Sequence, residues 1–170
     1  GQKSCDSSVV EIAAAPSSLT GFVVNAVVRS VAMTWTPSTD PSVLRALVKW
    51  GTSATALTNE FIVPGPTAQS FIHSGNPVRV LNKALTSNVA TLTTEVAHGL
   101  VVGDSVFVSG IDATFDGTYV VKSKTTTTFT YDRVAANVAA VALTYAGVAQ
   151  KSNSLAIGQT YYYQVAFIYT

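Results

Sequence analysis

The chain has 170 residues, of which 48% are hydrophobic and only 11% are charged, with a formal net charge of +1. This length holds one large domain or two small ones, with enough apolar residues to build a core. The basic residues are scattered singly and no apolar stretch is long enough to cross a bilayer, so neither a nucleic-acid partner nor a membrane is expected.

The first 15 residues are expected to form an N-terminal arm (1–15). Val9, Val10 and Ile12 are apolar residues in this arm that could add an edge strand or dock on a neighbouring subunit. Cys5 is the only cysteine, so an internal disulfide is impossible. Its thiol is either spare or bonded to a neighbouring subunit, and we count Cys5 among the candidate interface residues.

Alternating apolar residues predict two half-buried strands in the first part of the chain, because side chains alternate between the faces of a strand. In segment 27–36 one face carries Val31, Met33 and Trp35. After a turn at 37–41, segment 44–50 repeats the pattern with Leu44, Ala46, Val48 and Trp50. Shorter strands are predicted at 61–63 and 70–73.

Beyond residue 77 the sequence becomes rich in threonine. It predicts strands at 87–94, around Val106 and Val108, at 118–122 and at 126–131. Asp116-Gly117 predicts a tight hairpin turn, since a short hairpin needs positive φ angles. Segment 135–143 permits helix or strand, and we favour a loop followed by a strand.

The last segment predicts a strand in which Tyr161, Tyr163, Val165 and Phe167 share the inner face. Tyr162 then points outward, where it could touch a partner. The tyrosines also permit a sugar-stacking platform, although the alternation favours core or interface packing. No helical stripe of useful length occurs, so the predicted class is all-β.

Two separate regions resemble the fibronectin type III family. Trp35 stands where the family has its strand B tryptophan, and 44–50 matches strand C. Leu155, Gly158 and Tyr161 match the corner that leads into strand F. The resemblance implies an immunoglobulin-like (fibronectin type III) β-sandwich built from 16–76 and 148–170, with Ile157 departing from the usual proline and the chain ending at strand F.

The run from His98 to Val121, which includes Phe115-Asp116-Gly117-Thr118-Tyr119, resembles a small β module of tailed-bacteriophage virion proteins. The resemblance implies an inserted small β-barrel-like domain at 77–147. Without a strand G, the edge of strand F needs a cover. The arm around Val9, a neighbouring subunit or a further C-terminal segment could supply it.

The two histidines, His73 and His98, are expected to be structural, because neither a third histidine nor another cysteine completes a metal site or a triad. Asp112, Thr114 and Asp116 weakly resemble a calcium loop, but Ser123 stands where a glutamate is needed. Asp104 is expected to cap a turn. We therefore predict no catalytic, cofactor or metal site.

Together these patterns predict a non-enzymatic structural protein on the surface of a bacteriophage virion, either a capsid decoration protein or a tail or fibre component. Its partners would be other virion proteins or further copies of itself, in a homo-oligomer or lattice. One alternative is an adhesion module that recognises a glycan of the host surface, which predicts exposed aromatic residues clustered on one face of the insert. Another is an accessory domain of a larger enzyme, which predicts that the native gene continues well past Thr170.

Overall fold

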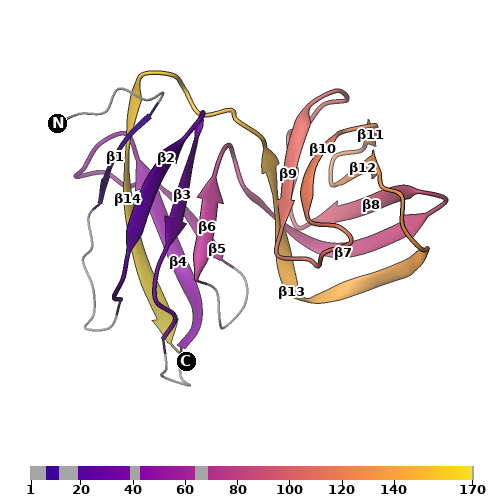
Figure 1. Ribbon diagram of the computed structural model, residues 1–170, viewed down its shortest axis with the longest axis horizontal. Helices are drawn as coiled ribbons and strands as arrows, with labels where there is room; N and C mark the ends of the chain where they lie inside the picture. Colours follow the sequence, from indigo (N-terminus) through magenta and orange to yellow (C-terminus); the bar gives the residue numbers. More distant parts are fainter. Residues whose placement is uncertain (1–6, 12–18, 39–42, 64–68, 170) are drawn as a thin grey trace. The chain divides into compact units, whose positions relative to one another are not determined.

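The computed structural model describes residues 7–11, 19–38, 43–63 and 69–169. These residues form strands and connecting loops without a helix, so the predicted all-β class is confirmed. Within the same ranges no helix could therefore cross a membrane. The chain divides into two compact units (Figure 1): unit 1 comprises Gly1–Ser74 and Asn153–Thr170, and unit 2 comprises Gly75–Ser152.

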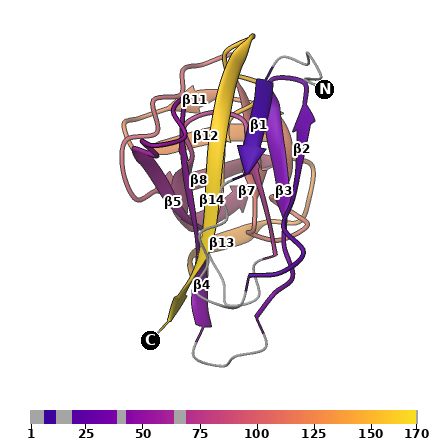
Figure 2. The same ribbon diagram turned by 90° about the vertical axis from the view of Figure 1, so that its left-hand side faces the viewer.

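Unit 1 is a sandwich-like pair of sheets with strand orders β1-β14-β4-β5 and β2-β3-β6. Its strands are β1 (Ser7–Glu11), β2 (Val23–Val27), β3 (Ser30–Thr34), β4 (Val43–Gly51), β5 (Asn59–Val63), β6 (Ser70–His73) and β14 (Gln159–Tyr169). Figure 2 shows the four-stranded sheet with β1 lying beside β14.

The alternation predicted for the first two long segments is confirmed over β3 and from Ala46 to Trp50 of β4, but 27–36 is not a single strand, because Val27 ends β2 and Val28 and Arg29 form the turn into β3. On β3 the side chains of Val31 and Met33 are buried, as is that of Trp35 just after the strand. On β4, Val48 and Trp50 are buried too. Alternate residues of a strand face opposite sides, so each sheet contributes one apolar face to the core of unit 1.

Strand β14 has a neighbour on both sides. It pairs antiparallel with β4, and β1 lies parallel to it, with Val9 opposite Tyr161 and Val10 opposite Tyr162. Of the three covers expected for this edge, the structure therefore shows the N-terminal arm along the first half of β14. Cys5 and Ile12 lie outside the described residues.

A hydrogen bond closes the corner before β14. The backbone N–H of Ala156 donates to the hydroxyl of Tyr161, with 3.2 Å between the atoms, and Leu155 is buried. The hydroxyl thereby satisfies a loop N–H that has no strand partner.

Unit 2 is a seven-stranded sheet with the order β10-β9-β13-β7-β8-β12-β11. Its strands are β7 (Val78–Thr86), β8 (Val89–Thr94), β9 (Ser105–Ser109), β10 (Gly117–Val120), β11 (Ser123–Lys124), β12 (Thr128–Asp132) and β13 (Val138–Lys151). The two end strands, β10 and β11, are joined by only Val121 and Lys122, and the N–H of Lys122 donates to the carbonyl of Thr130. The sheet therefore curls into a half-barrel around an apolar core.

The tight turn of unit 2 lies elsewhere than the sequence predicted. Strands β7 and β8 are joined by Ser87 and Asn88, which both have positive φ (50° and 63°) as a two-residue hairpin turn requires. Asp116-Gly117 is not a two-residue turn, because the β9–β10 connection runs over 110–116. The loop and strand expected over 135–143 are confirmed, with β13 beginning at Val138.

The chain leaves and re-enters unit 1 at neighbouring points. The N–H and the hydroxyl of Ser154 both donate to the carbonyl of Ser74, over 2.8 and 2.7 Å. In unit 2 the N–H of Gly75 donates to the side-chain carbonyl of Gln150. Within each unit, residues about 75 to 80 positions apart in the sequence are thus held together where the chain crosses over.

Candidate functional site

Both ring nitrogens of His98 are committed to the backbone of its own loop and of β12. The N–H of Leu100 donates to Nδ1 over 3.0 Å, which makes Nδ1 an acceptor. Nε2 must then carry the proton, and it donates to the carbonyl of Thr128 over 3.1 Å. The ring also packs edge-on against Phe129, so the structural role expected for His98 is confirmed.

His73 lies in the core of unit 1. Its Nδ1 shares a hydrogen bond of 2.8 Å with the hydroxyl of Tyr163, and its ring packs against that of Trp50. Burial raises the pKa of the Tyr163 hydroxyl, with a further contribution from neighbouring Tyr161. Both side chains are buried, so the hydroxyl and the imidazole satisfy each other's polar atoms within the core.

The aspartates of unit 2 hold loops. Asp104 accepts from the N–H of Val101 and pairs with Lys151, and the Lys151 hydrogen bond is the main reason why the pKa of Asp104 lies below its usual value. The expected capping role of Asp104 is thus confirmed. Asp116 accepts from the N–H of Ile111 over 2.9 Å, and burial raises the pKa of Asp116.

Asp112 accepts from the N–H of Thr114 over 2.8 Å and forms an ion pair with Lys83. The carboxylates of Asp112 and Asp116 are therefore engaged with backbone N–H groups and, for Asp112, with a lysine. Among the residues that the structure describes, no group of three histidine, cysteine or acidic side chains is placed to hold a metal ion.

One edge of β13 in unit 2 lacks a paired strand over part of its length. Strand β7 pairs with β13 through Val138, Val141 and Ala142. On the other side, the pairing with β9 begins only at Val148. In the described part of the chain, therefore, no strand pairs with the β9 side of β13 over 138–145. Over 143–146 the β7 side of β13 has no paired residue either.

This open edge, residues 138–145, is apolar and uncharged. Val141 is 45% exposed and Tyr145 58% exposed, and the alanines between Val138 and Val141 are exposed as well. No charged residue occurs from 134 to 150. Long apolar edges normally carry a charge, a proline or a cover, because bare N–H and C=O groups recruit further strands.

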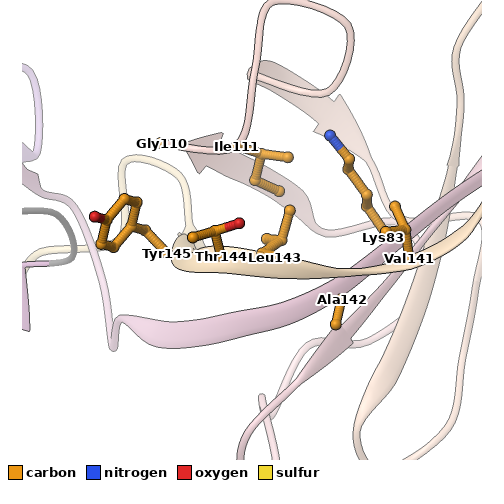
Figure 3. Close-up of a pocket in the computed structure, with 8 residues that line it drawn as sticks. All are labelled: Lys83, Gly110, Ile111, Val141, Ala142, Leu143, Thr144 and Tyr145. Atoms are coloured by element: carbon orange, nitrogen blue, oxygen red, sulfur yellow. The ribbon is translucent and has the colours of Figure 1, made fainter.

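A shallow hollow of about 320 Å³ lies beside the open edge (Figure 3). It is lined by Lys83, Gly110, Ile111, Val141, Ala142, Leu143, Thr144 and Tyr145. Figure 3 shows the side chains of Lys83, Val141 and Leu143 projecting from the sheet toward that of Ile111.

The only cation of the hollow is already neutralised. The ammonium of Lys83 pairs with Asp112 and lies 5.3 Å from the centre of the Phe115 ring. Its charge therefore gives the hollow little preference for an anionic ligand.

Neither a family model nor a curated protein matches this sequence. Among solved structures, the chain is similar to the phage phi92 endosialidase, with a TM-score of 0.38 and 15% sequence identity. The match covers 85% of this chain, which spans only 19% of the length of that protein. A distant structural neighbour is thus a phage protein that is itself an enzyme.

The interface residues expected from the sequence lie in unit 1, whereas the open edge lies in unit 2. Val9 and Val10 belong to β1, and Tyr162 is half-buried on β14 between its partners Val10 and Gly51. Sequence reasoning missed the β13 edge. The uncharged run 134–150 was its signal in the sequence, bracketed by Arg133 and Lys151.

Proposed function

We propose that this chain is a non-enzymatic structural protein of a bacteriophage particle, a capsid decoration protein or a tail component, which acts by binding other subunits. The observation that carries this proposal is the open, uncharged edge 138–145 of β13. An isolated protein with such an edge is prone to association, and a partner strand would satisfy both its backbone groups and its apolar side chains.

The sequence of unit 2 supports the phage setting. The segment from His98 to Val121 resembles a module of tailed-phage virion proteins, and it supplies β9, β10 and the loop between them. In this structure the polar residues of that segment form hydrogen bonds with loop backbone, and its apolar residues lie in the core of unit 2. Because the polar side chains of this module form hydrogen bonds within its own loops, the module suits a structural role, in which its surface contacts other subunits.

The described polar residues support binding over catalysis. His98 uses both ring nitrogens on backbone groups, and Asp112 and Asp116 accept from loop N–H groups. A general acid or base has to reach a substrate with a free proton-transfer atom. These side chains are occupied in holding the fold.

The glycan-binding alternative finds less support. It predicts exposed aromatic residues clustered on the insert, and among the described residues of unit 2 the exposed aromatic side chain is Tyr145 alone. A sugar platform uses several rings side by side, whereas one tyrosine at a strand edge suits strand pairing equally well.

The test is to purify particles of the phage that carries this gene on a density gradient and to quantify the chain by mass spectrometry. We expect the chain in a fixed, multiple copy number per particle, with β13 buried in an electron cryomicroscopy map. Absence of the chain from purified particles would refute the proposal.

A further inference from the structure

The loop that joins β8 to β9 in unit 2, residues 95–104, is tied to β12 by the imidazole of His98. We propose that His98 is an acid-sensitive latch: the neutral imidazole holds segment 97–100 in place, and protonation of its Nδ1 atom releases this segment. The inference concerns the response of unit 2 to pH and does not rest on the proposed function.

The hydrogen bonds of the latch require one protonation state of the ring. Nδ1 accepts from the N–H of Leu100, whereas the proton on Nε2 is donated to the carbonyl of Thr128. An imidazolium carries a proton on both nitrogens and accepts from neither. Protonation of Nδ1 would therefore set two N–H groups against each other and leave the N–H of the buried Leu100 without its acceptor, which costs the desolvation of that group.

The backbone of the loop is shaped for this contact. Gly99, between His98 and Leu100, has a positive φ of 66°, which glycine adopts without the steric penalty of other residues. The chain turns back at this point, so the N–H of Leu100 reaches the ring two positions before it. The ring itself packs edge-on against Phe129 of β12, with 5.5 Å between the ring centres.

The loop has anchors on either side of the latch that keep their form in mild acid. Before the latch, the hydroxyl of Thr94 donates to the carbonyl of Val96 over 2.6 Å, and a hydroxyl does not titrate in this range. After the latch, the carboxylate of Asp104 accepts from the N–H of Val101, and the hydrogen bond from Lys151 holds the pKa of Asp104 below its usual value. Protonation of the imidazole therefore loosens the segment between two points that stay fixed.

In the described part of the chain, no acidic side chain forms a hydrogen bond or an ion pair with the ring of His98. The carboxylates of this loop and of β12 are paired with cations: Glu95 with Arg79, Asp104 with Lys151 and Asp132 with Lys122. The side chain of Lys124, on the neighbouring strand β11, is itself a cation. The closed loop therefore favours the neutral ring, whereas an open loop leaves the ring in water, which solvates both forms.

Acid consequently favours the open loop. An exposed imidazole gains its second proton near pH 6.5, so below about that pH the open form binds more protons than the closed form. The equilibrium constant for opening then rises by up to about tenfold for each further pH unit. Opening uncovers Leu100 and the edge of Phe129, in a loop where Val96, Val101 and Val102 are already 55%, 52% and 62% exposed. Mild acid thus enlarges an apolar surface of unit 2.

Amide hydrogen exchange of the whole chain, followed by NMR at about pH 7.5 and about pH 5.5 and corrected for the intrinsic pH dependence of exchange, measures the opening. Leu92 on β8, which has a paired strand on each side, is the reference for unfolding of unit 2. We expect the opening constant at the Leu100 amide to exceed that at the Leu92 amide, and to rise about three- to tenfold at the lower pH. Equal opening constants at the two amides, or no change with pH at Leu100, would overturn the inference.

His98→Gln is the matched variant, because the glutamine amide offers one acceptor and two donors but does not titrate. We expect the opening constant at Leu100 in this variant to be the same at both pH values. A pH dependence that survives in the variant would show that another group is responsible and would refute the latch.

A further measurement on the unaltered chain does not depend on how well the variant folds. The nitrogen-15 chemical shifts of the imidazole at about pH 7.5 report which ring nitrogen carries the proton. We expect an unprotonated Nδ1 and a protonated Nε2 at His98. The opposite tautomer would contradict the latch, since its Nδ1 could not accept from Leu100.

Discussion

The Nδ1 atom of His73 and the hydroxyl of Tyr163 lie 2.8 Å apart in the core of unit 1, although the two residues are 90 positions apart in the sequence. His73 ends β6 and Tyr163 lies in β14, so this hydrogen bond joins the two sheets of the sandwich. It also joins the parts of unit 1 that come before and after unit 2 in the sequence.

Tyr163→Phe removes this hydrogen bond while keeping the ring. We expect the free energy of unfolding of unit 1 to fall by about 1–2 kcal/mol, because His73 loses a buried partner. Tyr162→Phe, at the half-buried neighbouring position, is the control and is expected to cost less. Urea denaturation followed by tryptophan fluorescence measures both, and equal losses would argue against a special role for the pair.

Alkaline pH should destabilise both units. Burial raises the pKa of the Tyr131 and Tyr163 hydroxyls in the folded chain, so both stay protonated when exposed tyrosines ionise. The unfolded chain releases these protons near pH 10 and then binds fewer protons than the folded chain. Its stability must therefore fall as the pH rises above about 10, by roughly 1.4 kcal/mol per pH unit for each buried tyrosine.

Urea denaturation at a series of alkaline pH values measures this slope. Tyr163→Phe removes one of the two ionisable groups and should leave the slope of unit 1 shallower, with unit 2 unchanged. Unfolding free energies that do not change between about pH 9 and pH 11 would contradict the assignment of protonated, buried hydroxyls.

Gly147 is required where β13 passes the loop that begins at Gly110. A Cβ atom at this position would overlap Cγ1 of Ile111 and lie 3.2 Å from the carbonyl oxygen of Ser109. We expect Gly147→Ala to destabilise unit 2 by about 1–3 kcal/mol, as overpacking does. Chemical denaturation of unit 2 measures this loss.

Ile111→Ala supplies the control, because it removes the atoms that the new methyl group would meet. The double variant should lose less stability than the sum of the two single variants, by about 1 kcal/mol. Strictly additive losses would show that Ile111 is not what makes glycine necessary at position 147.

The sequence predicted the sandwich strands because their apolar side chains alternate. On β14, Tyr163 and Val165 are buried while their neighbours are half-buried, and on β3 the buried Val31 and Met33 flank the half-buried Ala32. The same reasoning missed β7, where Asn82, Lys83 and Ala84 interrupt the alternation with half-buried positions. In a curled sheet the burial of a side chain depends on the curvature of the sheet, and the alternation of residues along one strand does not predict this curvature.

The sequence analysis misplaced the tight turn and missed the open edge of β13 for related reasons. Asp116-Gly117 has the composition of a tight turn, but the turn lies at Ser87-Asn88, where the pairing of β7 with β8 forces both residues to positive φ. The open edge of β13 follows from where the pairing with β9 begins. Pairing register arises from tertiary structure, so composition gave only the uncharged run as a hint.

The hydrogen bonds of Ser154 to Ser74, and of Gly75 to Gln150, have a consequence for the order of folding. During synthesis β14 leaves the ribosome after all of unit 2, so the sandwich has to wait for its central strand. If unit 2 folds first, it brings the ends of a long loop together and removes on the order of 2–3 kcal/mol of closure entropy from the folding of unit 1. Folded unit 2 would then hold close together the two parts of unit 1 that it separates in the sequence.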